Sequence, residues 1–354
     1  MDSQFITQFQ NKLLEWYDSC ARILPWRDNP TPYRVWISEI MLQQTRVDTV
    51  KPYFESFMKT VPTIQDLADI SEDQLLKLWE GLGYYSRAKN LKKAANAIMQ
   101  SFNGQIPSDL ESLRSLPGIG PYSSGAIASI AFGARVAAID GNVLRVMARI
   151  FANKGDIANR LVKKEIEDLV YELLPTSRVG DFNQALMELG ATICLPNGNP
   201  KCAECLVNTL CKGYQKGFAA ELPIKSKKKE RKIEQRTIFI IEYKGTVAIR
   251  QRANKGLLSS LWEFPNEVGY LSCEESERKL KEWGITPSHI SLSKTSKHIF
   301  THLEWHMIGY YISAQSIQED SQFIWVNREQ VKEQYSIPTA FKAYVEFLNE
   351  SGKK

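Results

Sequence analysis

The stretch Leu116-Pro117-Gly118-Ile119-Gly120-Pro121-Tyr122 lies between two segments with helical patterns and decides how the N-terminal half of this sequence folds. Gly118 and Gly120 permit a tight backbone turn. We expect residues 123–132 to form the next helix, whose first backbone N–H groups offer a site for a phosphate. A plain turn between two helices has the same ingredients. The stretch alone therefore predicts a helical hairpin and leaves phosphate binding open.

Outward from the hairpin, Asp140-Gly141-Asn142 lies at the mouth of a further expected helix, residues 143–151. An N-cap is the simpler interpretation of Asp140. The alternative is a carboxylate placed at the end of an apolar segment, where it stabilises a developing positive charge. The apolar residues 136–139 before it fit a short strand or a buried lead-in to the helix.

A second carboxyl lies in the other direction, inside the apolar helix pattern of residues 35–42, VWISEIML. Glu39 is therefore expected to be buried. A buried carboxyl is costly unless it is paired, and burial raises its pKa. A raised pKa suits a general acid, and an ion pair in the core is the structural alternative.

Four of the six cysteines crowd into residues 194–211, with the spacing Cys194-x7-Cys202-x2-Cys205-x5-Cys211. Cys20 and Cys273 stand alone. A reducing compartment disfavours disulfides, so the crowded four are candidate ligands. Their spacing leaves zinc and a 4Fe–4S cluster both open.

Length and charge add weaker constraints. A chain of 354 residues favours two domains, and a net charge of +5 permits nucleic-acid binding without arguing for it. No run of 18 apolar residues exists, and residues 1–10 do not resemble a secretory signal. We therefore expect a cytoplasmic protein without a membrane partner.

The character of the sequence changes near residue 213. Residues 1–213 have helical patterns, with starts expected at Thr63, at Ser71 (paired with Gln74 in a capping box) and at Ser108. Residues 214–235 carry a basic run, from Lys225 to Lys232, that is typical of a solvated linker; contact with phosphates is the alternative.

Residues 236–350 predict an α+β domain. Strand patterns at 237–243 and 246–250 flank the turn Lys244-Gly245. Further strands are expected at 298–300, 304–312 and 322–326, and a helix at 274–283.

Together these pieces resemble the helix–hairpin–helix DNA glycosylases of the endonuclease III superfamily, and within it the MutY-type adenine DNA glycosylases. The resemblance covers almost the whole chain. It rests on LPWR at 24–27, SEIMLQQT at 38–45, WEGLGYYSRAKNL at 79–91, LPGIGPY at 116–122, AIDGNVLRV at 138–146, FNQALMELG at 182–190 and the four cysteines.

The resemblance implies a 4Fe–4S cluster held by Cys194, Cys202, Cys205 and Cys211 in a loop spanning 194–211. The family usually has six residues between the first two cysteines, and this chain has seven. A loop marked as irregular by Pro196, Gly198 and Pro200 is expected to absorb the extra residue.

The resemblance also implies a reaction. Endonuclease III-like relatives carry a lysine where this chain has Tyr122, so we expect base removal by hydrolysis with little strand cutting. Glu39 would protonate N7 of a flipped adenine, and Asp140 would stabilise the oxocarbenium-like sugar as an ion pair or by transient covalent attachment. Asn142 and Tyr122 would position these groups.

Further residues take roles by resemblance alone. Arg22, Trp26, Arg27 and Gln184 would line the base pocket, and Gly118 and Gly120 would approach the DNA backbone. Gln44 and Tyr84 would wedge into the base stack, while Thr45 and Leu82 would lie near the opposite base. Ordinary packing is the alternative for Leu82 and Tyr84.

In the second domain, residues 256–265 (GLLSSLWEFP) resemble the opening of the Nudix box. Its acidic half is missing, since Glu274, Glu275 and Glu277 lack the required order, so no magnesium site is expected. Phe300-Thr301-His302 falls in a candidate loop where the family often has Phe-Ser-His in contact with 8-oxoguanine. Packing at the end of a strand is the alternative.

The sequence thus predicts a mostly α N-terminal helix–hairpin–helix glycosylase domain with an iron–sulfur loop, plus an α+β Nudix-like C-terminal domain. We expect a monomeric enzyme, cytoplasmic and associated with a bacterial-type nucleoid, that acts on double-stranded DNA containing 8-oxoguanine:adenine or guanine:adenine pairs. Alternatives are a thymine-glycol glycosylase/lyase, disfavoured by Tyr122, and a lesion-binding protein without turnover, disfavoured by Glu39 with Asp140. Nucleotide hydrolysis by the second domain is disfavoured by the missing acidic half.

Overall fold

A computed structural model describes residues 1–196, 199–226, 230–318 and 322–351. The expectations for Gly198 and for Lys227–Lys229 of the basic linker fall outside these ranges. The chain forms two compact units, and each is described by itself. The first combines residues 1–69 with 90–227, and the second combines 70–89 with 228–354.

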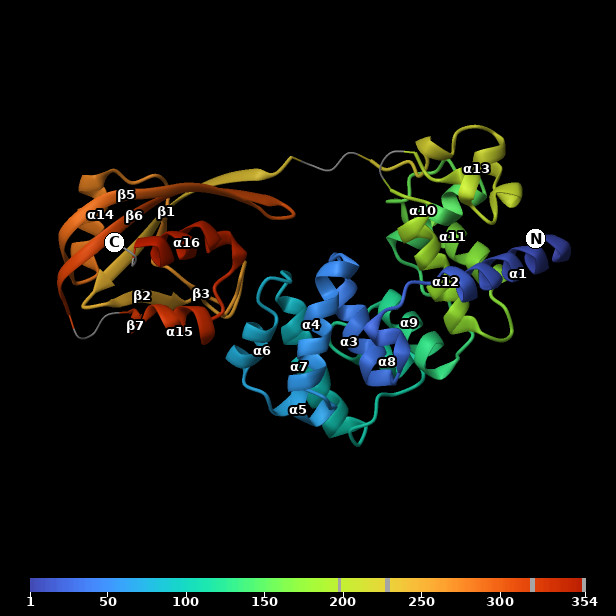
Figure 1. Cartoon of the computed structure of the whole chain (residues 1–354), viewed down its shortest axis with the longest axis horizontal. Helices are drawn as coiled ribbons and strands as arrows, with labels where there is room; N and C mark the ends of the chain where they lie inside the picture. The colour runs from blue at the N-terminus through green and yellow to red at the C-terminus, as the bar shows by residue number, and fades with distance from the viewer. Residues whose placement is uncertain (197–198, 227–229, 319–321, 352–354) are drawn as a thin grey trace. The chain divides into compact units, whose positions relative to one another are not determined.

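The first unit is built from helices (Figure 1). Its elements are α1 (Ser3–Cys20), α2 (Pro25–Asp28), α3 (Pro32–Leu42), α4 (Val47–Thr60), α5 (Ile64–Asp69), α7 (Ser86–Ser101, which begins in the second unit), α8 (Leu110–Ser115), α9 (Pro121–Phe132), α10 (Gly141–Ile150), α11 (Arg160–Leu173), α12 (Val179–Thr192) and α13 (Lys212–Gln215), with short 3-10 turns at Cys202–Glu204, Asn208–Leu210 and Ala219–Glu221. Helix α12 packs against α1, α9 and α10, and α3 packs against α9. Phe9, Val146, Phe182 and Leu186 lie fully buried where these helices meet.

Helix α9 packs unusually close to its neighbours because small residues cover it. A Cβ atom added to Gly125 would lie 2.2 Å from the carbonyl oxygen of Ala137, and one on Gly180 of α12 would lie 2.7 Å from that of Ser129. The helix begins at Pro121, two residues earlier than the sequence predicted, because proline suits the first helical position. The close packing fixes the start of α9, and with it Tyr122, relative to α3 and α12.

Residues 136–139 form the lead-in to the helix and not the short strand, the two alternatives that the sequence left open. The Asn183 side chain of α12 takes their hydrogen bonds: its Oδ1 accepts from Ala138 N–H at 3.2 Å and its Nδ2 donates to Val136 O at 2.8 Å. One local expectation needs correction. The N-cap of α8 is Asp109 and not Ser108, since Asp109 accepts a bond of 2.8 Å from Ser112 N–H. The capping box of Ser71 and Gln74 at the start of α6 (Glu72–Leu78) is confirmed.

The second unit contains a mixed sheet of seven described strands in the order β3-β2-β1-β6-β5, with β4 added to β1 and β7 to β2. The strands are β1 (Lys232–Tyr243), β2 (Thr246–Gln251), β3 (Trp262–Glu263), β4 (Asn266–Val268), β5 (Ile285–Ile299), β6 (Leu303–Ile317) and β7 (Ile324–Val326). Strands β1 and β6 are parallel, and the other pairs are antiparallel.

Both faces of this sheet are covered. Side chains alternate along β1, so Ile238 and Ile240 face one apolar layer while Phe239 and Ile241 face the other. The first layer contains Phe341 and residues of α16 (Lys342–Ser351), and the second contains residues of α14 (Cys273–Glu282). Helices α6 and α15 (Arg328–Glu333), both labelled in Figure 1, and a 3-10 turn at Thr339–Phe341 also belong to this unit.

The predicted fold class, helical first and α+β second, is confirmed. The turn Lys244-Gly245 joins β1 to β2 with both residues at positive φ, as a two-residue hairpin requires. The long strand β5 was expected only at its end, and the short strands β3 and β4 were not expected. Within the described residues, no helix is both long and apolar enough to cross a membrane.

Candidate active site

The first unit contains an open cavity of about 630 Å³ where α3, α9, α10 and α12 converge. Twelve of the predicted site residues line it: Arg22, Trp26, Arg27, Glu39, Gln44, Thr45, Gly118, Gly120, Tyr122, Asp140, Asn142 and Gln184. Small-molecule sites are typically about 300–1,000 Å³. The cavity is therefore large enough for a nucleotide taken out of a duplex.

Glu39 lies near the end of α3 and is only 6% exposed. The hydroxyl of Tyr122, at the start of α9, donates to its Oε2. Burial, with a smaller contribution from nearby Asp140, raises the pKa of the Glu39 carboxyl to about 7, although the Tyr122 hydrogen bond and Arg27 oppose the shift. Near neutral pH this side chain therefore holds a proton in a large fraction of molecules, as a general acid must.

Tyr122 stays a neutral hydroxyl, because burial and the neighbouring carboxyls raise its pKa well above the usual value. The sulfur of Met187 lies 3.2 Å from the same hydroxyl. The hydroxyl is thus held between Glu39 and Met187. It places no amine in the cavity.

Asp140 is the N-cap of α10, and its carboxyl also lies in the cavity. Its Oδ1 caps α10 by accepting from Val143 N–H at 2.8 Å, and the residue also lines the cavity. Its Oδ2 accepts from Asn142 Nδ2 at 2.6 Å. Burial raises the pKa of Asp140, and these two hydrogen bonds oppose the rise by favouring the ionised form. The cap therefore also fixes the orientation of a carboxylate toward the cavity.

Asn142 is held in turn by Arg145, whose Nη2 donates to its Oδ1 at 2.9 Å. The same guanidinium donates to the carbonyl oxygens of Gly190 and Cys194, each at 2.8 Å. Through Arg145, the Asn142 side chain that bonds to Asp140 is therefore connected to Gly190 of α12 and to Cys194.

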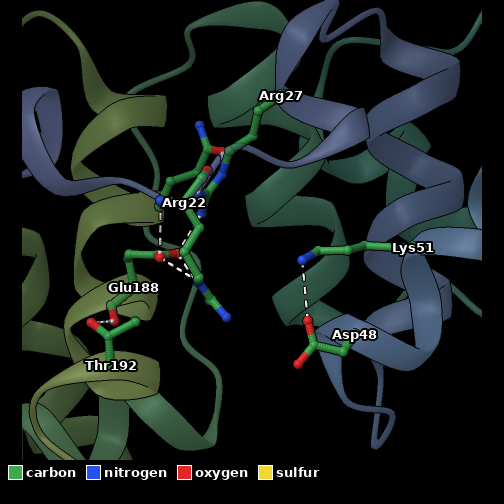
Figure 2. A network of polar contacts seen from close by, with 7 residues as sticks. Arg22, Arg27, Asp48, Lys51, Glu188 and Thr192 are labelled. Atoms are coloured by element: carbon green, nitrogen blue, oxygen red, sulfur yellow. Dashed lines mark hydrogen bonds and ion pairs between the residues drawn. The ribbon is translucent and has the colours of Figure 1, made fainter.

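Glu188 on α12 is a cavity residue that the sequence analysis missed. It is 1% exposed, and it accepts from Arg22 Nη2 at 3.0 Å and from Arg27 Nη2 at 2.9 Å (Figure 2). Burial raises its pKa, but the bonds and charges of the two arginines outweigh this and the net pKa is lowered. Arg27 Nε also donates to Gln184 Oε1 at 3.1 Å. The spacing of four residues between Gln184 and Glu188 places both on one helix face, which was the available signal.

The hairpin turn before α9 requires glycine at one of its two positions. Gly118 has a φ of +80°, and a Cβ there would lie 2.7 Å from the Cβ of Asn90. Gly120 has extended backbone and open space around it. As N-cap of α9 it has no side chain to bond the first N–H groups, which leaves them available to a phosphate.

Five predicted site residues lie in the second unit: Leu82, Tyr84, Phe300, Thr301 and His302. Within that unit the Tyr84 and Thr301 hydroxyl oxygens are 3.3 Å apart. Tyr84 is exposed and has a φ of +49°, whereas Leu82 is buried.

The loop between β5 and β6 contains three of these residues, Phe300, Thr301 and His302. The Phe300 ring packs edge-on against Trp305, with ring centroids 4.9 Å apart. Phe300 therefore makes the packing contact at the strand end that was the alternative to contact with the base. Thr301 and the following His302 lie in the loop that joins the two strands, and Phe300 N–H donates to Leu303 O across it at 2.8 Å. The turn thereby exposes the Thr301 hydroxyl.

Cys194, Cys202, Cys205 and Cys211 line one pocket beside α10. Arg149 Nη1 lies 3.2 Å from Cys194 Sγ, and Cys211 Sγ lies 3.4 Å from Arg149 O. Burial raises the pKa of the Cys205 thiol to about 12 and also raises the pKa values of Cys202 and Cys211.

Among the described His, Cys, Asp and Glu side chains, no three are arranged as a closed metal site. The four thiols share a pocket, but their sulfur atoms are not arranged around one common point. Four thiols around one buried pocket, with a guanidinium beside one of them, are a donor set that fits a thiolate-bound cluster. Cys20 and Cys273 are exposed and separate from this pocket.

Known proteins share both halves of the chain. Residues 37–172 match the HhH-GPD superfamily of base excision DNA repair proteins, and residues 237–347 match the NUDIX domain. Adenine DNA glycosylase of Homo sapiens is 35% identical over 84% of this chain, which covers 66% of the human protein and so just under two thirds of its length. Adenine DNA glycosylase of Buchnera aphidicola subsp. Baizongia pistaciae is 35% identical over 90% of this chain and 91% of that protein.

Solved structures resemble the first unit. A structure described as a thermostable thymine-DNA glycosylase has a TM-score of 0.55 and 30% identity, over 60% of this chain and 98% of that one. Endonuclease III in a non-covalent DNA complex has a TM-score of 0.52 and 21% identity, over 61% of this chain and 98% of that one, which shows the fold alone. By its relatives and its two matched domains, the chain belongs to the adenine DNA glycosylase family, whose members are base excision repair enzymes.

Proposed function

We propose that this protein removes adenine from 8-oxoguanine:adenine pairs, and from guanine:adenine pairs, by hydrolysing the N-glycosidic bond in double-stranded DNA. The observation that carries the proposal is one cavity in which two of the lining carboxyls, those of Glu39 and Asp140, have different surroundings. Glu39 accepts one hydroxyl bond and has a pKa of about 7, whereas Asp140 accepts an amide bond on each oxygen. The surroundings of Glu39 suit a general acid, and those of Asp140 suit a carboxylate that stabilises positive charge.

The reaction begins with adenine turned out of the duplex into the cavity, which costs a few kcal/mol of stacking energy. The proton on Glu39 passes to N7 of the adenine. The bond between C1′ and N9 then breaks, and its electron pair stays on N9. The sugar is left with positive charge near C1′, which the Asp140 carboxylate stabilises in a site of low dielectric constant.

A water molecule completes the reaction by adding to C1′. Its proton returns to Glu39, so the enzyme ends in the state in which it started. The products are free adenine and an abasic site. Tyr122 places a hydroxyl and not an amine beside Glu39, so no Schiff base forms there and the strand stays intact.

The rest of the cavity binds the base. Arg27 donates to both Gln184 and Glu188, and Trp26 lies beside Phe54, so these side chains hold fixed positions. Gln44 and Thr45 follow α3 at the cavity rim. We assign Trp26, Arg27 and Gln184 to the adenine pocket, with Arg22 behind them, and the N-terminus of α9 with Gly118 and Gly120 to the DNA backbone.

We assign recognition of the base opposite adenine to the second unit. Thr301 and Tyr84 offer two adjacent hydroxyls for an 8-oxoguanine, with Leu82 and His302 nearby in the sequence. The acidic residues of α14 have other partners: Glu275 belongs to the capping box of Ser272, and Glu277 pairs with Lys281. Recognition, and not nucleotide hydrolysis, is therefore the function that we propose for this Nudix-like domain.

We also propose that Cys194, Cys202, Cys205 and Cys211 hold a 4Fe–4S cluster. When bound, such a cluster cross-links the segment 194–211. Arg145 and Arg149 of α10 bond to that segment, and Asp140 is the N-cap of the same helix. The cross-link would therefore stabilise the position of α10. An absorbance band near roughly 400 nm would distinguish an iron–sulfur protein from a colourless zinc protein.

The test is base release from three duplexes, containing 8-oxoguanine:adenine, guanine:adenine or guanine:thymine pairs, each with and without subsequent alkali. We expect adenine release from the first two and strand cleavage only after alkali. No adenine release would overturn the proposal. Strand cleavage without alkali, at the yield of base release, would overturn its hydrolytic form, and thymine release alone would move the chain to the activity named for the thymine-DNA glycosylase. We expect a monomer, which sedimentation with and without DNA would check.

A further inference from the structure

A second cavity, of about 330 Å³, lies in the second unit beside the strands β1, β2 and β3. Its lining contains three arginines, Arg236, Arg250 and Arg252, and a single acid, Glu263. Gln251 and Ala253 complete the lining. Guanidinium groups keep their charge at all accessible pH values. The side chains around this cavity therefore carry an excess of positive charge.

The arginines are held rigidly. Arg250 faces Glu263 across the β2–β3 pair and donates to its Oε1 at 3.0 Å, while Arg252 donates to its Oε2. Glu263 is 2% exposed, so one buried carboxylate aligns two guanidiniums. Arg250 also donates to Asn266 O at 2.9 Å, and Arg252 Nε donates to Leu257 O at 3.1 Å.

An aromatic ring supports the same group. The guanidinium carbons of Arg236 and Arg252 lie 4.3 Å and 5.7 Å from the centroid of the Trp305 ring. Arg236 is also bonded to Glu234 and Asn266. The positions of the cations are thus fixed before any ligand binds, which lowers the entropy cost of binding.

Two donors are left over. In the part of the chain that the structure describes, Arg250 Nη1 and Arg252 Nη2 make no hydrogen bond. Arg250 lies in β2 and Arg252 directly follows this strand, and the shared bonds to Glu263 hold the two guanidiniums at the same cavity. Two fixed guanidiniums with free N–H groups match the several oxygens of a phosphate.

We propose that this arginine cavity binds a phosphate group, either of the DNA backbone or of a free purine nucleotide. Its volume falls within the range of about 300–1,000 Å³ for small-ligand sites, which suits a nucleotide better than an isolated ion. The Trp305 ring that supports the arginines also contacts Phe300, which precedes Thr301. The site therefore adjoins the loop to which we assign contact with the opposite base, although it does not depend on adenine removal.

The test uses the full chain with dGMP as the probe, in isothermal titration calorimetry at low salt. Ala253 is exposed, and its side chain makes none of the arginine contacts. Ala253→Glu adds a negative charge at the cavity, and Ala253→Gln adds the same volume without charge. We expect roughly tenfold weaker dGMP binding for Ala253→Glu and binding within about twofold of the original chain for Ala253→Gln.

Gln251→Glu is a second charged variant at an exposed position, with the original glutamine as its uncharged counterpart; it also loses the bond of 3.1 Å from Gln251 Nε2 to Ser260 O. It keeps the test decisive should Ala253→Glu not fold. Circular dichroism and melting temperature establish folding for each variant.

A second arm identifies the source of the phosphate by measuring duplex affinity between about 50 and 200 mM salt. If the site binds DNA, Ala253→Glu lowers the affinity and reduces the slope of log K against log salt by about one, and Ala253→Gln does not. If the ligand is a free nucleotide, only the dGMP affinity falls. Equal dGMP and duplex binding by the charged variants and their uncharged counterparts would overturn the proposal.

Discussion

Glu39 and Glu188 line the same cavity, and both are almost completely buried, yet their pKa values shift in opposite directions. Glu39 faces a hydroxyl and another carboxyl, and burial raises its pKa to about 7. Burial acts on Glu188 in the same sense, but two guanidiniums reverse it and lower the pKa. The charge of the partners, and not the depth of burial, decides which carboxyl keeps a proton.

This difference separates two tasks within one cavity. The Glu39 carboxyl, which is bonded to a hydroxyl and not to a guanidinium, is available to give a proton to a nucleobase. The Glu188 carboxyl, bonded to two cations, fixes Arg22 and Arg27 (Figure 2). Through Arg27 it also fixes Gln184. Asp140 lies between these cases, since burial raises its pKa while amide donors hold it in place.

The largest expected effect comes from Asp140→Asn. Asparagine caps a helix about as well as aspartate, so we expect the free energy of unfolding to change by less than about 1 kcal/mol. Loss of the negative charge should lower the single-turnover rate of adenine release by about 10³-fold or more. Binding to the 8-oxoguanine:adenine duplex, measured by gel shift, should persist. Retained release by a folded variant would remove Asp140 from the mechanism.

Glu39→Gln should lower the release rate by about 10²–10⁴-fold, because the amide has no acidic proton to give. It should also stabilise the fold at high pH. The pKa of Glu39 is raised in the folded state, so its contribution to stability is full below the unfolded value and is lost as the pH rises through about 7. Urea unfolding should therefore favour the variant by about 2 kcal/mol more at pH 8 than at pH 5. The same difference at both pH values would contradict the assignment.

Glu188→Gln should show the reverse dependence. Its pKa is lowered in the folded state, so the ion pairs stabilise the fold above the unfolded pKa and lose that effect as the pH falls through the folded one. Arg22 and Arg27 keep 35% and 17% exposure, so water moderates the cost. We expect a loss of about 1–3 kcal/mol at pH 7 that shrinks toward pH 3. Glu15→Gln, at an exposed position of α1, is the control and should change stability little at either pH.

The smallest expected effect is at Thr301, outside the cavity of the two glutamates. Thr301→Ala removes a hydroxyl, so the preference for 8-oxoguanine over guanine opposite adenine should fall by about 3–10-fold. Thr301→Ser keeps the hydroxyl and should preserve the preference. The ratio of single-turnover rates on the two duplexes measures it, and equal ratios for all three proteins would show that this loop does not read the opposite base.

The sequence was sufficient to predict those features that depend on one short segment alone. The apolar residues around Glu39 predicted its burial, and Asp140 before a helix predicted the cap that it makes. The bond from Tyr122 to Glu39 joins residues far apart in sequence, so it was predictable only through the resemblance.

Other features depended on tertiary partners that no local pattern contains. Residues 136–139 have strand-like composition, but Asn183 satisfies their backbone groups. Glu188 is held by Arg22 and by Arg27 of α2, which are more than 150 residues away in the sequence, so no local pattern around it showed its partners. Strand β5 alternates polar side chains on an exposed edge, so its hydrophobic signal was weak over most of its length.

The most direct test of the central claim, that the protonated Glu39 carboxyl starts the removal of adenine, is the single-turnover release rate between pH 5 and 9. The account predicts a rate that is level at low pH and falls about tenfold per pH unit above about 7, as Glu39 loses its proton. A rate that stays level or rises up to pH 9 would contradict the account.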